Sequence, residues 1–142
     1  MKQKLAIDTN IIIRLLTGDP NKLFKQAEQL VQEVEKGVLS FYVPSMIVAE
    51  SCWVLESYYK VSKREIADTL IEFLQSDGVE VEEPWIINAL NDFADNNVDF
   101  IDAYLAKKAQ GSGLNVITWN EKDFRRLKCE FYTPNNLLGS KK

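Results

Sequence analysis

The residues of this sequence that could do chemistry are mainly carboxylates. Four of them follow a predicted strand or lie among apolar residues of a predicted helix: Asp8, Glu50, Asp102 and Asp123. Ligands of open α/β sheets bind beyond the carboxyl ends of the strands. We therefore expect the four side chains to meet in one cavity, as an inference from their placement along the chain.

Two of these carboxylates follow predicted strands. Asp8 comes directly after the apolar run 5–7, and Asp123 lies one turn beyond Thr118 and Asn120, where a second apolar run ends. Aspartate and asparagine are also good helix N-caps. Taken singly, Asp8 and Asn120 are better explained as caps of the helices that follow them.

Glu50 lies within a predicted helix over 45–59. The apolar face of that helix comprises Ile47, Val54, Leu55 and Tyr58. Because Glu50 follows Ile47 by three residues and precedes Val54 by four, we expect it to point inward. An ionised carboxylate facing a core is costly unless it is paired or bound to metal. Pairing with Arg14 or a lysine is the alternative explanation.

Asp102 lies between Ile101 and Ala103, so the same cost applies to it. Asp99 precedes it by three residues and therefore shares its helical face. For Asp99 itself, the sequence favours an N-cap or a supporting role over direct participation in a site.

Carboxylates that share a cavity repel one another strongly unless a cation neutralises them. The sequence contains no histidine, which excludes Ser-His-Asp relays and histidine-rich zinc sites. Its two cysteines, Cys52 and Cys129, have no CxxC partner and are expected to be buried thiols. Oxygen ligands alone select Mg²⁺ or Mn²⁺. Such ions commonly act on phosphates, where they polarise the phosphate, activate water and stabilise the leaving oxygen.

Strand and helix patterns alternate along the chain. Strands are predicted over 4–8, 38–43, 79–82, 114–118 and 130–132, and helices over 10–16, 21–36, 45–59, 62–77, 84–94, 99–110 and 121–127. We expect the first strand to be buried. This alternation predicts a three-layer α/β/α architecture with a central, mainly parallel sheet of four to five strands. Since 142 residues show no linker or repeat, we expect a single domain over 1–142.

The composition is that of a soluble globular protein, with 46% hydrophobic and 27% charged residues. The apolar runs are far shorter than the roughly 20 residues of a membrane span, and we expect a cytoplasmic protein. A net charge of −4 argues against a nonspecific coat for nucleic acid. It does not exclude a nuclease whose acidic residues gather in one pocket around divalent cations.

Four short motifs, in this order and at this separation, resemble the PIN-domain ribonucleases. The resemblance is strongest to the VapC-like toxins of bacterial and archaeal toxin-antitoxin pairs, and it spans nearly the whole chain. The motifs are Ile7-Asp8-Thr9-Asn10, Val48-Ala49-Glu50, Asp99-Phe100-Ile101-Asp102-Ala103 and Thr118-Trp119-Asn120-Glu121-Lys122-Asp123-Phe124. No single motif is decisive, but the set is specific.

This resemblance implies roles for individual residues. Asp8 and Asp102 would bind the metal directly, Glu50 would be a ligand or a water-orienting base, and Asp123 would be the last acidic member. Three further residues would hold the site or contact phosphate: Thr9, Thr118 and Asn120. Many relatives carry an aspartate where Asn120 stands, so the fourth acidic position lies between Asn120 and Asp123.

The resemblance also implies a homodimer and, in toxin members, an antitoxin whose C-terminal segment blocks the acidic groove. RNA would be the substrate. Five basic residues could line the groove, although a solvated helix face explains them equally well: Lys107, Lys108, Arg125, Arg126 and Lys128. Exposed aromatic residues such as Tyr58, Tyr59 and Trp119 could stack bases or form a dimer seam, with core packing as the default explanation.

The favoured function is a Mg²⁺-dependent endoribonuclease that leaves a 5′-phosphate and a 3′-hydroxyl, acting as a toxin. One alternative is a phosphohydrolase with Asp8 as nucleophile. That chemistry usually requires a second carboxylate two residues later, where this chain has Asn10. The other alternative is a catalytically silent binding module with the PIN fold.

Overall fold

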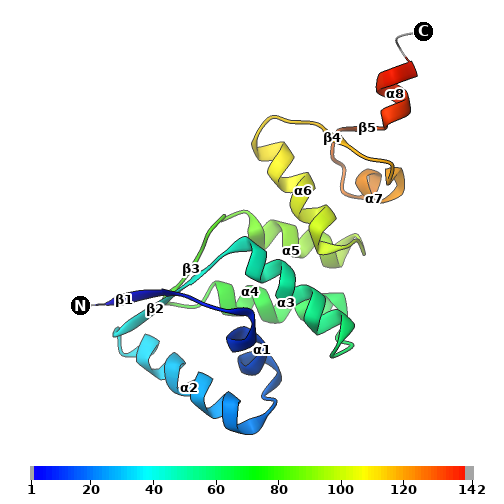
Figure 1. Ribbon diagram of the computed structural model, residues 1–142. Helices are drawn as coiled ribbons and strands as arrows, with labels where there is room; N and C mark the ends of the chain where they lie inside the picture. Colours follow the sequence, from blue (N-terminus) through cyan, green and yellow to red (C-terminus); the bar gives the residue numbers. More distant parts are fainter. Residues whose placement is uncertain (1, 140–142) are drawn as a thin grey trace. The chain divides into compact units, whose positions relative to one another are not determined.

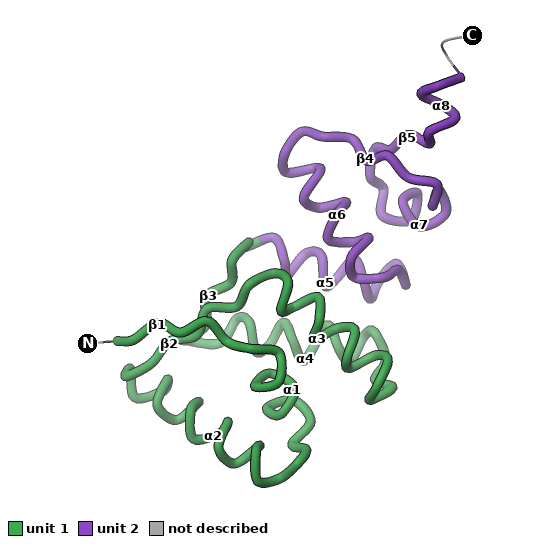
Figure 2. Tube along the Cα trace, in the orientation of Figure 1, with its two compact units in different colours: residues 1–84 green, residues 85–142 purple. Residues whose placement is uncertain are grey.

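The computed structural model describes residues 2–139. The chain forms two compact units, Met1–Pro84 (unit 1) and Trp85–Lys142 (unit 2), which Figure 2 distinguishes by colour. Within the described residues, no helix is both long and apolar enough to span a bilayer. The single domain expected over 1–142 stays a prediction.

Unit 1 is built on a parallel sheet of three strands. The strands are β1 (Gln3–Ala6), β2 (Leu39–Val43) and β3 (Val79–Val81), in the order β1-β2-β3. In the central strand, Phe41 lies opposite both Leu5 of β1 and Val79 of β3. Four helices connect the strands (Figure 1): α1 (Thr9–Thr17), α2 (Asn21–Glu35), α3 (Ser45–Ser57) and α4 (Lys63–Leu74).

Local signals in the sequence explain where these helices begin and end. The side chain of Ser62 accepts a hydrogen bond from the Glu65 amide and caps α4. The α1 helix ends at Gly18, whose φ of 71° is the left-handed conformation that terminates many helices. The helices then pack through residues with almost no exposure, among them Ile12, Val48 and Leu70.

The turn between α4 and β3 requires a glycine. Gly78 has a φ of +82°, which other residues rarely adopt. A Cβ atom at this position would also lie 2.4 Å from Cγ1 of Val34, near the end of α2. The turn therefore packs directly against α2.

The first strand differs from the prediction. All four residues of β1 are exposed, with Leu5 at 38%, so the expected buried strand is wrong. Among the described residues, β1 is an edge strand whose one pairing partner is β2. Burial begins one residue after β1, at Ile7.

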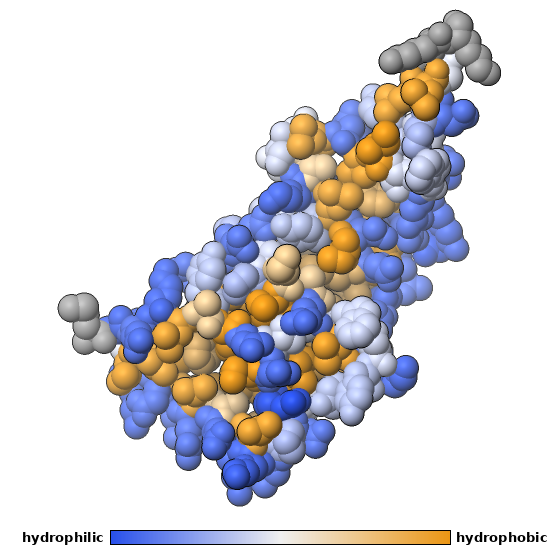
Figure 3. All heavy atoms as spheres, viewed as in Figure 1, coloured by the Kyte–Doolittle hydropathy of each residue, from blue (hydrophilic) through white to orange (hydrophobic). Residues whose placement is uncertain are grey.

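Unit 2 combines helices with a second, two-stranded parallel sheet. Its elements are α5 (Ile86–Asp95), α6 (Phe100–Gly111), β4 (Val116–Ile117), α7 (Glu121–Arg126), β5 (Phe131–Tyr132) and α8 (Pro134–Gly139). The α5 and α6 helices pack together, with the rings of Phe93 and Phe100 edge to face and 6.1 Å apart. Figure 3 shows apolar atoms at the surface over β4, β5 and α8, where Ile117 and Leu138 are exposed.

The fold class is confirmed: parallel strands alternate with helices along the chain. Among the described residues, the five strands form two sheets, three strands in unit 1 and two in unit 2. The helix expected from Pro84 begins at Ile86, because Pro84 and Trp85 form a turn. The short α8 helix was not predicted.

Candidate active site

In unit 1, the acidic motif forms the start of α1. Oδ1 of Asp8 accepts a hydrogen bond of 3.1 Å from the Asn10 amide, which makes Asp8 the N-cap of α1. This cap leaves the Asp8 side chain exposed. Thr9 is only 4% exposed, and its hydroxyl donates a hydrogen bond to Oε1 of Glu50. The first and second motifs therefore meet through Thr9 and Glu50.

Glu50 does not point into the core of unit 1, so that expectation is corrected. Its side chain is exposed. The buried face of α3 instead comprises Ser45, Val48, Ser51, Cys52 and Leu55. Pairing with Arg14 does not occur either, because Nη1 of Arg14 donates to the Tyr59 hydroxyl at 3.4 Å. Thr9 is the hydrogen-bond partner of the Glu50 carboxylate.

In unit 2, two carboxylates act electrostatically on a third, Asp102. Burial raises the pKa of Asp102 above its usual 3.8, and the negative charges of Asp99 and Asp123 raise it further. Asp99 occupies the N-cap position of α6, but its side chain makes no capping hydrogen bond. The predicted N-cap position of Asp99 is therefore confirmed, although its side chain makes no capping hydrogen bond and its charge acts on Asp102.

A hydrogen-bond network orients the last of these carboxylates. The backbone N–H of Asn120 donates to Oγ1 of Thr118 at 2.9 Å, and its side-chain Nδ2 donates to Oδ2 of Asp123 at 2.9 Å. Oδ1 of Asn120 accepts from the Asp123 amide at 3.3 Å and so caps α7. A carboxylate at position 120 would have no N–H to donate to Asp123. The asparagine therefore orients the Asp123 carboxylate, and which of the two completes the site stays a prediction.

The oxygen donors suit a hard divalent cation, since carboxylates are the ligands that Mg²⁺ and Mn²⁺ prefer. Asp8 and Glu50 belong to unit 1, and Asp99, Asp102 and Asp123 belong to unit 2. Within residues 2–139, no three acidic or cysteine side chains are gathered in a way that could hold a metal ion. Convergence of the four carboxylates stays a prediction.

Some of the predicted basic groove residues are already paired. Lys107 forms an ion pair with Asp92 at 3.1 Å, and Arg125 forms one with Glu121 at 3.0 Å. The exposed pair within α7 favours the solvated helix face for Arg125, whereas Lys107 is half-buried and its pair joins α6 to α5. The cysteines agree with expectation: both thiols are free and buried, and burial raises the pKa of each.

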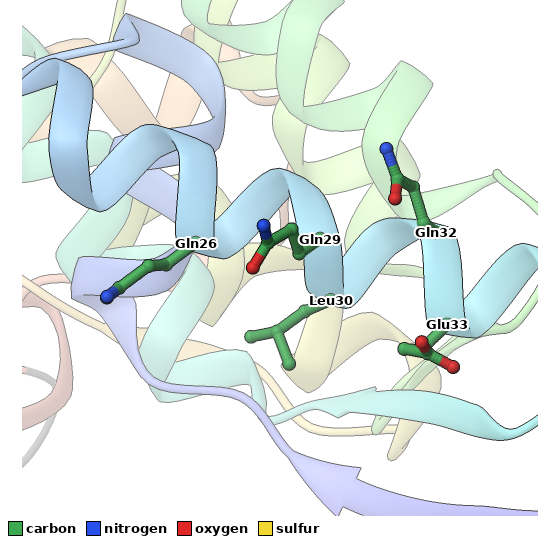
Figure 4. Close-up of a pocket in the computed structure, with 5 residues that line it drawn as sticks. All are labelled: Gln26, Gln29, Leu30, Gln32 and Glu33. Carbon is green, nitrogen blue, oxygen red and sulfur yellow. The ribbon is translucent and has the colours of Figure 1, made fainter.

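A separate surface pocket lies along α2. Figure 4 shows its lining side chains, which all come from this one helix: Gln26, Gln29, Leu30, Gln32 and Glu33. Its single carboxylate, Glu33, lies 3.5 Å from the ammonium of Lys36. One paired carboxylate among amides cannot hold a divalent cation, so this pocket is not a candidate for the catalytic site.

Sequence and structure comparisons identify relatives of the chain. The PIN domain family matches residues 5–128. The VapC ribonuclease of Aquifex aeolicus (strain VF5) is 23% identical over 129 residues, which cover 90% of this chain and 95% of that protein.

Two solved structures also align with the chain. The structure of FitAB bound to an IR36 DNA fragment aligns with 93% of this chain and 95% of that one, at 17% identity and a TM-score of 0.35. The crystal structure of FitAcB from Neisseria gonorrhoeae aligns with 93% of this chain and 98% of that one, at 19% identity and a TM-score of 0.33.

Proposed function

The chain belongs to the PIN-domain family, and from this premise we propose that it is a Mg²⁺- or Mn²⁺-dependent endoribonuclease. The proposed ligands of the ion are the carboxylates of the four motifs: Asp8, Glu50, Asp102 and Asp123. The name of the relative from Aquifex aeolicus, a VapC ribonuclease, supports RNA as the substrate.

The observation that carries this proposal is the unfavourable environment of Asp102. Burial and the charges of Asp99 and Asp123 all oppose its ionisation. A protein gains no stability from such crowding, but a bound divalent cation relieves it, because the cation stabilises the ionised form of every nearby carboxylate. The same reasoning supports Asp99 as a supporting residue.

Individual residues would then have separate roles in RNA hydrolysis. A bound ion supplies polarisation of the scissile phosphate and a lower pKa for the attacking water. The Thr9 hydroxyl donates to Oε1 of Glu50, which would leave Oε2 available to bind the ion or to orient a water molecule. Asn120 holds Oδ2 of Asp123, so that Oδ1 keeps its lone pairs for the site. The products would carry a 5′-phosphate and a 3′-hydroxyl.

We also propose the biological setting that the motif resemblance implies. The protein would be a homodimer that acts as the toxin of a toxin-antitoxin pair in the cytoplasm, with the antitoxin blocking the acidic groove. The catalytic unit would be one domain over residues 1–142.

A cleavage assay tests the proposed activity. Purified protein is incubated with end-labelled RNA in Mn²⁺ or Mg²⁺, in EDTA, and as the Asp8→Asn variant. Asparagine caps helices as well as aspartate does, so this variant keeps the start of α1 while losing the charge. We expect at least a 100-fold loss of cleavage, because even outer residues of metal sites cost about 10- to 100-fold.

The matched control is Asp68→Asn, which makes the same change on the exposed surface of α4, where Asp68 pairs with Arg64. It should cleave RNA like the wild type. Cleavage that survives both EDTA and Asp8→Asn would refute the proposal. Turnover of a phosphate monoester through a trapped aspartyl-phosphate would support the phosphohydrolase instead.

A further inference from the structure

A second pocket in unit 1 lies between α1, the segment that follows it, and the end of α3. Its cavity volume is about 300 Å³, which is at the lower end of the range for small-ligand sites. Most of its lining side chains are polar or aromatic, and they include Asn10, Arg14, Asp19, Val54, Tyr58 and Tyr59. In Figure 1, α1 lies beside α3, and the two helices are in contact.

Arg14 is the only cation in the lining of this pocket, and its hydrogen bonding is incomplete. Its Nε atom is buried and has no hydrogen-bond partner among the described residues. Its one hydrogen bond is the 3.4 Å contact from Nη1 to the Tyr59 hydroxyl, which is long for an N–H···O bond. No carboxylate of residues 2–139 lies within ion-pair distance of this guanidinium, although Asp19 lines the same pocket.

A half-buried guanidinium without a counter-ion is unfavourable, because it has lost part of its hydration and gained no anion. The planar fork of arginine matches the oxygens of a phosphate. An anionic ligand with several acceptor oxygens would therefore satisfy Arg14, whereas the protein itself leaves donors unused.

The aromatic residues of the pocket supply the second half of a nucleotide site. Tyr58 and Tyr59 form an edge-to-face pair with ring centroids 4.9 Å apart. Tyr58 is 74% exposed, so its ring is open to a ligand, and Tyr59 is anchored by Arg14. An exposed ring beside a cation is an arrangement that binds single-stranded nucleic acid, with a base on the ring and a phosphate on the cation.

We propose that this pocket binds one nucleotide of a single-stranded RNA, with its phosphate on Arg14 and its base on Tyr58. Asp19 would repel the phosphate and so favour its placement at Arg14, and its carboxylate can accept a hydrogen bond from a ribose hydroxyl. Asn10 lines the pocket, and its backbone N–H donates a hydrogen bond to Oδ1 of Asp8. The pocket thus lies next to the first acidic motif and would hold a nucleotide that flanks the cleaved bond.

This inference rests on the proposed function, because it takes the nucleotide to be part of the RNA that is cut. Binding is therefore measured separately from cleavage. A fluorescein-labelled decauridylate is titrated with the full chain in EDTA, where no hydrolysis should occur, and fluorescence anisotropy gives the Kd at several salt concentrations. Cleavage of the same RNA is measured in Mn²⁺.

The variants are Arg14→Gln, Tyr58→Ala and Tyr58→Phe. We expect Arg14→Gln to weaken binding about tenfold or more and to reduce the slope of log K against log salt by about 0.7. Tyr58→Ala should weaken binding about fivefold or more, while Tyr58→Phe keeps the ring and binds like the wild type. Arg64→Gln, which makes the same charge change on α4, is the matched control and should also bind like the wild type. Because Tyr58 is exposed, its variants test the site even if Arg14→Gln fails to fold.

Each outcome decides the inference. Unchanged Kd values for both Arg14→Gln and Tyr58→Ala overturn it, and the proposed nuclease stands if the wild type still cleaves. If Arg14→Gln weakens the binding of a labelled decaglutamate but leaves the binding of RNA unchanged, the pocket binds a protein partner. This result also overturns the inference. RNA binding that depends on both residues, without cleavage in Mn²⁺, supports the nucleotide site and refutes the nuclease.

Discussion

The hydrogen bond from Thr9 to Glu50 offers a quantitative test of how the site is organised. Thr9→Val keeps the shape of the side chain and removes the hydroxyl that donates to Oε1 of Glu50. Thr9 itself is only 4% exposed, whereas the Glu50 carboxylate is exposed. A hydrogen bond to a charged group contributes about 1.5–3 kcal/mol. If that energy serves to orient the carboxylate, its loss lowers kcat/KM by about 10- to 150-fold.

The assay for Thr9→Val is steady-state cleavage of a fluorogenic RNA at several Mn²⁺ concentrations. We expect a lower kcat and a higher Mn²⁺ requirement, with little change in the thermal midpoint. Thr9→Ser is the matched control, since it keeps the hydroxyl and should stay within a few-fold of the wild type. Wild-type kcat/KM in Thr9→Val would refute the idea that this hydrogen bond positions Glu50.

Two further predictions follow from the raised pKa values. Asp102→Asn should raise the thermal midpoint of the metal-free protein at pH 7. The pKa of Asp102 in the folded protein lies above the ordinary 3.8. The wild type therefore loses stability relative to this variant as pH rises from about 3.8 through the folded pKa. A difference in thermal midpoint between the two proteins that does not change with pH would contradict this explanation. In Cys129→Ser, the remaining thiol, Cys52, should react with a disulfide reagent at pH 8 only after unfolding in urea, because it is 2% exposed and burial raises its pKa. Rapid labelling of the native variant would show that Cys52 is accessible.

The local order of the elements could be predicted from the sequence, because the signals are themselves local. Asp8 and Ser62 cap helices through their own side chains, and Gly18 ends α1 in the left-handed conformation. Such features involve residues within a few positions of one another. The ends of the predicted helices therefore agree with the structure to within two or three residues.

The orientation of Glu50 could not be predicted in the same way. The buried face of α3 includes Ser51, which is fully buried and donates its hydroxyl to the Ile47 carbonyl. A serine whose hydroxyl is hydrogen-bonded within its own helix costs little to bury. Because serine is a polar residue type, the sequence nevertheless predicts an exposed side chain. The spacing of apolar residues therefore predicts a buried face that includes Ile47 and Val54, which differs from the face that is buried in the structure.

The electrostatic coupling in unit 2 also lies beyond sequence patterns. Nothing in the spacing of Asp102 and Asp123 shows that the charge of Asp123 acts on Asp102, because the two residues belong to different helices, α6 and α7. The role of Asn120 has the same origin: whether it replaces the acidic ligand or holds Asp123 depends on the direction of its amide group. Both depend on where the side chains lie in three dimensions.

The packing of Gly78 against Val34 limits how this sequence can change over evolutionary time. Two independent barriers close position 78 to other side chains: the backbone angle and the 2.4 Å approach to a valine methyl group. A smaller residue at position 34 would remove the second barrier and leave the first. Substitutions that shorten or reshape the turn before β3 would therefore be tolerated only together with changes in α2. We expect substitutions in these two segments to be correlated.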